Sequence, residues 1–186
     1  NRTPDAARYR AIVDLMGHAH LGVNTLLYLI DGLYSGVHPF DSAPRRWEAD
    51  PFGDDWTSSL FASQDPVAIE SVCLDLMQLE GDPRLYPQMA GVDDHLHEAA
   101  LAHDPPSGTF YDPDHAGDVA RLPSLGVYEH WNNPDDMQYS RNLGTGAGIE
   151  LVRASALSRV PEAHGGFGSR CEPNPFNTRT AIRFEL

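Results

Sequence analysis

The stretch SLFASQDPVAIESVCLDLMQLE, Ser59–Glu80, decides the fold, because it places a short apolar run directly before an amphipathic helix. The run Leu60–Ala62 predicts a strand. Asp65 is a good N-cap and Pro66 suits the first helical position, so a helix is predicted to begin there. Its apolar residues fall on one face: Ile69, Val72, Cys73, Leu76 and Leu79. Loops at such strand-to-helix junctions often carry the functional sites of α/β proteins.

Further elements flank this stretch on both sides. Arg8–Met16 predicts a short helix, and the apolar run Thr25–Ile30 predicts a buried strand that ends at Asp31. Asp93–His103 predicts a second helix with acidic residues in its first turn. Two more short strands are predicted, Leu125–His130 and Ile149–Arg153. The sequence therefore predicts an α/β fold, with a partial sheet, flanking helices and long loops.

The composition narrows the classes of partner. The 186 residues carry a formal net charge of −14, and all 13 basic residues are arginine. Nucleic acids and anionic membrane surfaces attract basic faces, so neither is a predicted partner. No apolar run reaches about 18 residues, which predicts no membrane span. Cys73 and Cys171 are far apart and form neither a disulfide framework nor a cysteine-based metal motif.

Four motifs carry a resemblance to one family. They are LIDGLY (Leu29–Tyr34), SLFASQDPVAIES (Ser59–Ser71), GVDDHLHEA (Gly91–Ala99) and SLGVYEHWNNPDDMQYSRNLGTGAGIEL (Ser124–Leu151). With them the chain resembles the family of domain of unknown function 362, and residues 1–153 are identified as the C-terminal portion of that domain. The resemblance implies that an N-terminal part of the domain is missing. It also implies an association with redox proteins, since some relatives carry iron–sulfur modules.

Two features of the sequence qualify this resemblance. No CxxC cluster occurs, so no iron–sulfur ligands are present in this chain. Family members often have Asp at the position of Glu70, which keeps the charge but extends the reach of the side chain.

The last residues carry a second resemblance. PNPFNTRTAIRFEL, Pro173–Leu186, resembles the opening of the C-terminal sorting domain of type IX secretion, with Thr178 where the usual form has Pro. Residues 173–186 are identified as the first strand of a truncated sorting domain, and residues 154–172 as a linker. The resemblance implies a secreted or outer-surface location, and it implies the secretion machinery as a partner of the tail.

Two carboxylates are the candidate catalytic residues. Asp31 and Asp65 each follow a predicted strand, and they share one edge of the sheet if the two strands are parallel neighbours. Two carboxylates at one edge bind a hard cation or share acid–base work. The structural alternatives are a helix cap for Asp65 and an Asp-Gly turn for Asp31.

Histidine and aspartate clusters supply candidate metal ligands. His18 and His20 form an HxH pair, whose side chains point to the same side in an extended segment. A second cluster contains Asp93, Asp94 and His95. His97 follows at i+2 on a predicted helix, where it does not face His95. A divalent metal is the candidate cofactor, and plain solvated side chains are the alternative.

A polar and aromatic segment supplies candidate ligand-binding residues. They are His130, Trp131, Asn132, Arg141 and Asn142. A planar Trp beside amides and an Arg can stack on and hydrogen-bond a sugar or another polar ligand. In the alternative, Trp131 anchors the loop to the core and its neighbours form a turn.

Two functions of different classes follow from these features. The first is an exported bacterial protein with a cation-dependent or redox-linked enzymatic site at the carboxyl ends of the strands. The second is a non-catalytic cell-surface module that binds polysaccharide or another polar small molecule. A third alternative is a passive part of a larger secreted polypeptide.

Overall fold

The chain divides into two units, Asn1–Leu151 and Val152–Leu186. A computed structural model describes residues 9–36, 43–81, 91–115, 117, 120–154, 168–172 and 181–185. Both units contain antiparallel strands, and the first adds helices, so the described chain is a mixed α and β structure. Among these residues, no helix combines the length and the apolar character needed to cross a bilayer.

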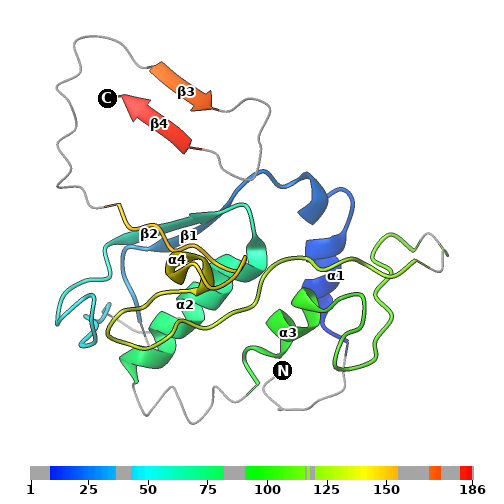
Figure 1. Ribbon diagram of the computed structural model, residues 1–186, viewed down its shortest axis with the longest axis horizontal. Coiled ribbons are helices and arrows are strands. Elements are labelled where there is room, and N and C mark those ends of the chain that lie inside the picture. Colours follow the sequence, from blue (N-terminus) through cyan, green and yellow to red (C-terminus); the bar gives the residue numbers. More distant parts are fainter. Residues whose placement is uncertain are drawn as a thin grey trace. The chain divides into compact units, whose positions relative to one another are not determined.

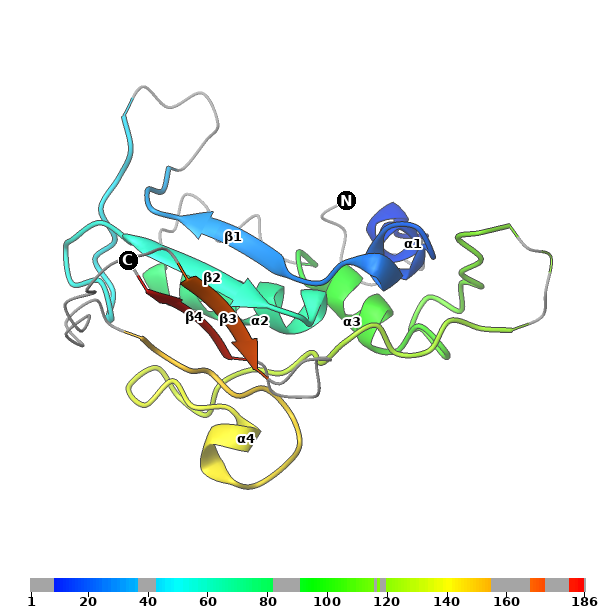
Figure 2. The same ribbon diagram turned by 90° about the horizontal axis from the view of Figure 1, so that it is seen from above.

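The first unit contains helices and one two-stranded sheet (Figure 1). Its elements in chain order are α1 (Ala11–Gly17), the 3-10 helix η1 (Gly22–Asn24), β1 (Tyr28–Gly32), β2 (Ser59–Ser63), α2 (Pro66–Glu80), α3 (Asp94–Ala100) and α4 (Ser140–Leu143). Helix α2 lies along one face of the sheet, and α1 and α3 lie side by side (Figure 1, Figure 2).

The predicted helix after Ser63 is confirmed as α2. The side chain of Asp65 accepts hydrogen bonds from Val67 N and Ala68 N, and Pro66 takes the first helical position. Gly81 ends the helix with a left-handed φ of 61°, which glycine adopts without a steric penalty. The helix buries more than the one predicted face, because the sheet covers one side and residues 120–151 pack on another.

Strands β1 and β2 pair antiparallel, with Tyr28 opposite Ser63 and Gly32 opposite Ser59. The prediction that Asp31 and Asp65 share one edge of the sheet required parallel strands, so it is wrong. The apolar run before Asp31 is also not a fully buried strand. Leu29 is 58 % exposed and Leu60 is 67 % exposed, because α2 covers only the opposite face of the sheet.

The two further strands predicted in the first unit are absent from the described residues. Leu125–His130 and Ile149–Arg153 run without strand pairing. Side chains bind backbone N–H groups of this region instead. Asp65 accepts a hydrogen bond from Val127 N, and Glu129 accepts one from Ile149 N. These bonds satisfy the backbone donors without a ladder.

Two apolar clusters hold α2 in place. One joins α1, α2 and α3 through buried residues: Val13, Met16, Val67, Leu74, Leu96, Ala99, Ala102 and Tyr111. The other joins α2 to the later segment through Val72, Leu76, Tyr139 and Ile149. Helix α2 thus contributes residues to both clusters.

In the second unit, β3 (Gly168–Glu172) pairs antiparallel with β4 (Ala181–Glu185). The predicted terminal strand is present as β4. Strand β3 falls within residues 154–172, which were predicted to be a linker, so this part of the linker is a strand. The remainder of the predicted linker beyond Ala154 lies outside the described residues.

Candidate functional site

The structure separates the two predicted catalytic carboxylates. Asp31 lies near the end of β1, and Asp65 follows β2 at the opposite end of the antiparallel pair. Asp31 is exposed and accepts a hydrogen bond from Leu33 N at 3.0 Å, as in an Asx turn. Asp65 uses Oδ1 to cap α2 and Oδ2 to accept from Val127 N at 2.9 Å. Asp31 therefore forms a turn and Asp65 caps a helix, which are the structural alternatives to a catalytic pair.

Substitution of Asp65 by alanine is expected to destabilise the protein by about 1–3 kcal/mol, because α2 loses its cap and Val127 N loses its acceptor. Asp65→Asn keeps one acceptor oxygen and should lose less. Urea unfolding followed by circular dichroism measures both changes. An unchanged free energy of unfolding in Asp65→Ala would contradict the capping role.

The predicted metal ligands do not come together. His18 Nε2 lies 3.5 Å from Asp114 Oδ1, and the ring of His20 is near that of His18. Asp94 pairs with Arg10, and His95 pairs with Glu70. Within the described ranges, no three or more His, Cys, Asp or Glu side chains are grouped so that they could hold an ion. Asp93 joins a different network, described below.

Most of the predicted ligand-binding residues stabilise their own loop. Asn132 Oδ1 accepts from two backbone N–H groups, and Asn142 binds both N and O of Leu151. Arg141 donates to Ala147 O at 3.0 Å. Trp131 is partly buried against the cluster around Tyr139. These contacts favour the alternative in which Trp131 anchors the loop.

His130 differs from these residues, because a buried carboxylate of α2 holds it. Asp75 is only 3 % exposed, and its Oδ1 lies 2.5 Å from His130 Nδ1. Its Oδ2 accepts from Trp131 N at 3.1 Å and from the Tyr139 hydroxyl at 2.8 Å. A carboxylate that orients a histidine through Nδ1 leaves Nε2 to exchange protons with another group.

A tyrosine continues this chain of hydrogen bonds to α3. The Tyr128 hydroxyl lies 2.7 Å from His130 Nε2 and donates to Asp93 Oδ2 at 2.9 Å. The same Oδ2 atom lies 3.3 Å from His97 Nε2. We call these five residues, Asp75, His130, Tyr128, Asp93 and His97, the Asp75–His97 network. Both histidines are about half exposed, so the network opens to solvent at two points.

The number of protons in the network determines which of its bonds can form. Nδ1 of His130 carries a proton when it donates to the Asp75 carboxylate. Tyr128 has one hydroxyl proton, so it cannot donate to both Asp93 and His130. The two contacts are both hydrogen bonds only when Nε2 is also protonated and donates to the Tyr128 oxygen. Loss of one proton from His130 therefore changes the direction or the partner of a Tyr128 hydrogen bond.

The pKa shifts in the network keep the tyrosine neutral and one aspartate ionised. Burial raises the pKa of Tyr128, and its hydrogen bond to Asp93 raises that pKa further. Burial opposes ionisation of Asp93, but hydrogen bonds from Tyr128 and its own backbone, together with His97, lower the pKa of Asp93 overall. Tyr128 therefore stays a neutral hydroxyl and donates its hydrogen bond to the ionised Asp93.

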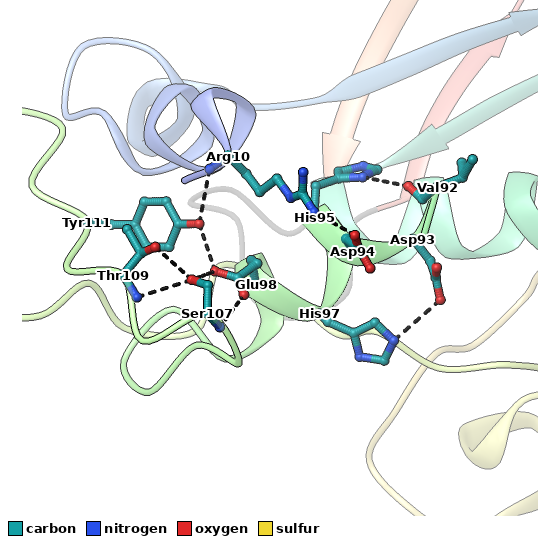
Figure 3. A network of polar contacts seen from close by, with 10 residues as sticks. All are labelled: Arg10, Val92, Asp93, Asp94, His95, His97, Glu98, Ser107, Thr109 and Tyr111. Atoms are coloured by element: carbon teal, nitrogen blue, oxygen red, sulfur yellow. Dashed lines mark hydrogen bonds and ion pairs between the residues drawn. The ribbon is translucent and has the colours of Figure 1, made fainter. Parts of the chain in front are cut away.

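A second buried carboxylate, Glu98, has a structural role. Glu98 of α3 is 4 % exposed and accepts from Ser107 N, from Ser107 Oγ and from the Tyr111 hydroxyl (Figure 3). The Tyr111 oxygen in turn accepts from Arg10 N at 3.3 Å. All partners of Glu98 belong to the loop after α3 and fix that loop to the helix.

The sequence pointed to Asp93 and His130, but not to Asp75 or Tyr128. One signal for Asp75 was available, since a charged residue between Leu74 and Leu76 on an apolar helix needs a buried partner. Nothing in the sequence showed that this partner lies 55 residues further along the chain.

Comparison of the chain with protein-family models, with curated proteins and with solved structures found no match. The two family resemblances of the sequence therefore stay predictions, and the function is argued from the geometry of the site.

Proposed function

We propose that this chain forms part of an enzyme that catalyses proton transfer at the Asp75–His97 network. His130 is the acid–base group, Asp75 orients it through Nδ1, and the neutral Tyr128 hydroxyl, fixed by its hydrogen bond to Asp93, contacts Nε2. The observation that carries the proposal is the position of His130. One ring nitrogen lies 2.5 Å from a buried carboxylate, and the other lies 2.7 Å from the hydroxyl of the partly buried Tyr128.

A purely structural role explains only half of the network. Asp75 needs partners because it is buried, and Trp131 N and the Tyr139 hydroxyl already anchor the later segment to α2. The continuation through Tyr128 to Asp93 and His97 is only partly buried, so its side chains also have water as a partner. A surface His held through both ring nitrogens loses rotational freedom, and such fixed orientation is what acid–base catalysis requires.

The setting of this enzyme is proposed from the sequence. The terminal resemblance supports an exported protein, secreted or held at the outer surface. The resemblance of the main body supports redox-linked chemistry. The cation-dependent version of the predicted site gains no support from the geometry, because Asp31 and Asp65 lie at opposite ends of the sheet. The polysaccharide alternative gains none either, because the Trp131 ring packs against the core.

The proposal predicts that activity depends on His130 and Tyr128 together. The purified chain is assayed with chromogenic esters, phosphates and glycosides, whose hydrolysis all requires proton transfer. His130→Gln and Tyr128→Phe are each expected to lower the rate at least about 100-fold for the substrate that wild type hydrolyses. His103→Gln, at an exposed histidine outside the network, should retain the wild-type rate.

Both variants are expected to fold, because neither removes a fully buried group. Circular dichroism checks that they do. An activity that persists in folded His130→Gln and folded Tyr128→Phe would place the catalytic site elsewhere.

A further inference from the structure

A pocket of about 570 Å³ lies where α1, η1, β1 and the first two turns of α2 meet. This volume lies within the range of sites that hold small molecules. The lining is mostly apolar, and it shares no residue with the Asp75–His97 network. The inference below is therefore independent of the proposed function.

Four large aliphatic side chains of this lining remain open to solvent. They are Ile12, Leu15, Leu21 and Leu29, and each is between 41 % and 58 % exposed. A single exposed leucine is ordinary, but several aliphatic side chains around one hollow are typical of a binding surface. A ligand with an apolar body gains free energy by removing them from water.

Glu70 is the only carboxylate among the described residues of the lining, and one of its oxygens is available to a ligand. Its Oε2 lies 2.6 Å from His95 Nε2, whereas no group in the described part of the chain donates to Oε1. The side chain is 36 % exposed, and Oε1 is not among the buried atoms that lack a partner. Oε1 is therefore accessible and can accept a hydrogen bond from a bound molecule.

The contact with His95 neutralises the charge of Glu70. Nδ1 of His95 lies 2.9 Å from Val92 O, which only accepts, so Nδ1 carries a proton. The hydrogen bond between Nε2 and Oε2 needs one further proton, and the pair of side chains has no net charge whichever atom carries it. His20 also lines the pocket, but it is exposed and its charge is screened by solvent. The lining thus matches an uncharged ligand, because an ion that left water here would find no opposite net charge.

The two hydroxyl groups of the lining already use their protons within the chain. The Thr25 hydroxyl donates to Leu21 O at 2.8 Å, and the Tyr28 hydroxyl donates to Gly22 O at 3.3 Å. Neither hydroxyl is free to donate to a ligand, although both oxygens can still accept. Together with Oε1 of Glu70, they favour a ligand that supplies a hydrogen-bond donor.

We propose that this pocket binds a small uncharged molecule with an apolar body and one hydroxyl group. The hydroxyl donates to Oε1 of Glu70, and the apolar body lies against Ile12, Leu15 and Leu21. A carboxylate of the same chain length fits worse, because at neutral pH it has no proton to donate and its oxygens meet another acceptor.

Four probes with a similar chain length and different head groups test the proposal: 1-hexanol, methyl pentyl ether, hexanoate and hexylammonium. Each is titrated into the intact chain at neutral pH, and the methyl signals of Ile12 and Leu15 are followed by nuclear magnetic resonance. 1-Hexanol should shift these signals in a saturable way and bind about tenfold more tightly than the ether, which has no donor. Both ions should bind more weakly than 1-hexanol.

Three results with the wild-type chain would overturn the proposal. The first is a set of methyl signals that does not respond to 1-hexanol. The second is equal affinity for 1-hexanol and the ether, which would show that no acceptor recognises the hydroxyl. The third is tighter binding of either ion, which would show that the lining has a net charge.

Two variants separate recognition of the hydroxyl from apolar contact. Glu70→Met should abolish the preference for 1-hexanol over the ether, because the acceptor is lost. Leu15→Ala should weaken the binding of both molecules about fivefold. Leu60→Ala is the matched control, since Leu60 is 67 % exposed and outside the pocket, and it should bind both as wild type does.

Both variants are expected to fold, because Glu70 and Leu15 are partly exposed, and circular dichroism checks this. A folded Glu70→Met variant that keeps the preference for 1-hexanol would overturn the proposal. Wild-type affinity for 1-hexanol in folded Leu15→Ala would place the binding site elsewhere. If either variant fails to fold, the wild-type comparison of the four probes decides the matter by itself.

Discussion

Substitution of Asp75 by alanine is expected to lower the free energy of unfolding by about 3–5 kcal/mol, which is a large part of the stability of a small protein. The carboxylate is 3 % exposed and has three partners. Its removal leaves the Tyr139 hydroxyl, which is fully buried, without an acceptor. It also frees the segment around Trp131 from α2, so the second apolar cluster loses part of its support.

Urea unfolding of Asp75→Ala beside Asp31→Ala measures this effect. Asp31 is exposed and accepts a single backbone hydrogen bond, so its loss should cost no more than about 1 kcal/mol. Asp75→Asn keeps the shape of the side chain, but its amide group can no longer accept from all three donors, and an intermediate loss is expected. A stability of Asp75→Ala within about 1 kcal/mol of wild type would contradict the account of the network.

The protein is expected to lose stability steeply as the pH rises above about 10, the ordinary pKa of tyrosine. Burial raises the pKa of Tyr111 and of Tyr139, and the adjacent carboxylates Glu98 and Asp75 raise these pKa values further. A raised pKa means that the folded state keeps its proton where the unfolded chain loses it. The stabilising contribution is therefore complete below pH 10 and decreases as the pH rises toward the folded pKa.

Each such tyrosine contributes about 1.4 kcal/mol per pH unit to this decrease, because the unfolded state alone releases the proton. The absence of lysine leaves few other groups to titrate in this range, although burial also raises the pKa of the Cys73 thiol to about 12. Unfolding free energies measured between pH 8 and about 11 give the slope.

Tyr139→Phe should remove about 1.4 kcal/mol per pH unit from that slope, since phenylalanine does not ionise. Tyr34→Phe is the matched control, because Tyr34 is 65 % exposed, and it should leave the slope unchanged. A slope that is the same in Tyr139→Phe and wild type would show that Tyr139 is not held as a neutral hydrogen-bond donor.

The sequence predicted the local part of the fold well. Helix α2 begins at Pro66 after an Asp65 cap, because capping and the restricted φ of proline act within a few residues. Helix α3 lies inside its predicted range and is shorter, whereas α1 begins three residues later than predicted and ends one residue later. The error at the ends of these helices is a local one, where the apolar pattern continues but the hydrogen-bonded turns do not.

The long-range part was not predictable from the residues alone. The direction of β1 relative to β2 depends on how residues 33–58 return the chain, and no local pattern specifies that path. The predicted catalytic pair Asp31 and Asp65 depended on this direction. Leu125–His130 and Ile149–Arg153 have strand-like patterns, but Asp65, Glu129 and Asn142 take up backbone donors of these segments. These contacts follow from tertiary packing, as does the pairing of Asp75 with His130.

The measurement that tests the central claim most directly is nitrogen-15 nuclear magnetic resonance of the His130 ring in wild type and two variants. The account predicts a protonated Nδ1 whose proton exchanges slowly with solvent in wild type and rapidly in Asp75→Asn. It also predicts that Tyr128→Phe shifts the Nε2 signal of His130, since the hydroxyl contact at Nε2 is lost. A His130 ring whose Nδ1 proton exchange and Nε2 signal are identical in wild type, Asp75→Asn and Tyr128→Phe would contradict the Asp75–His97 network as a site of proton transfer.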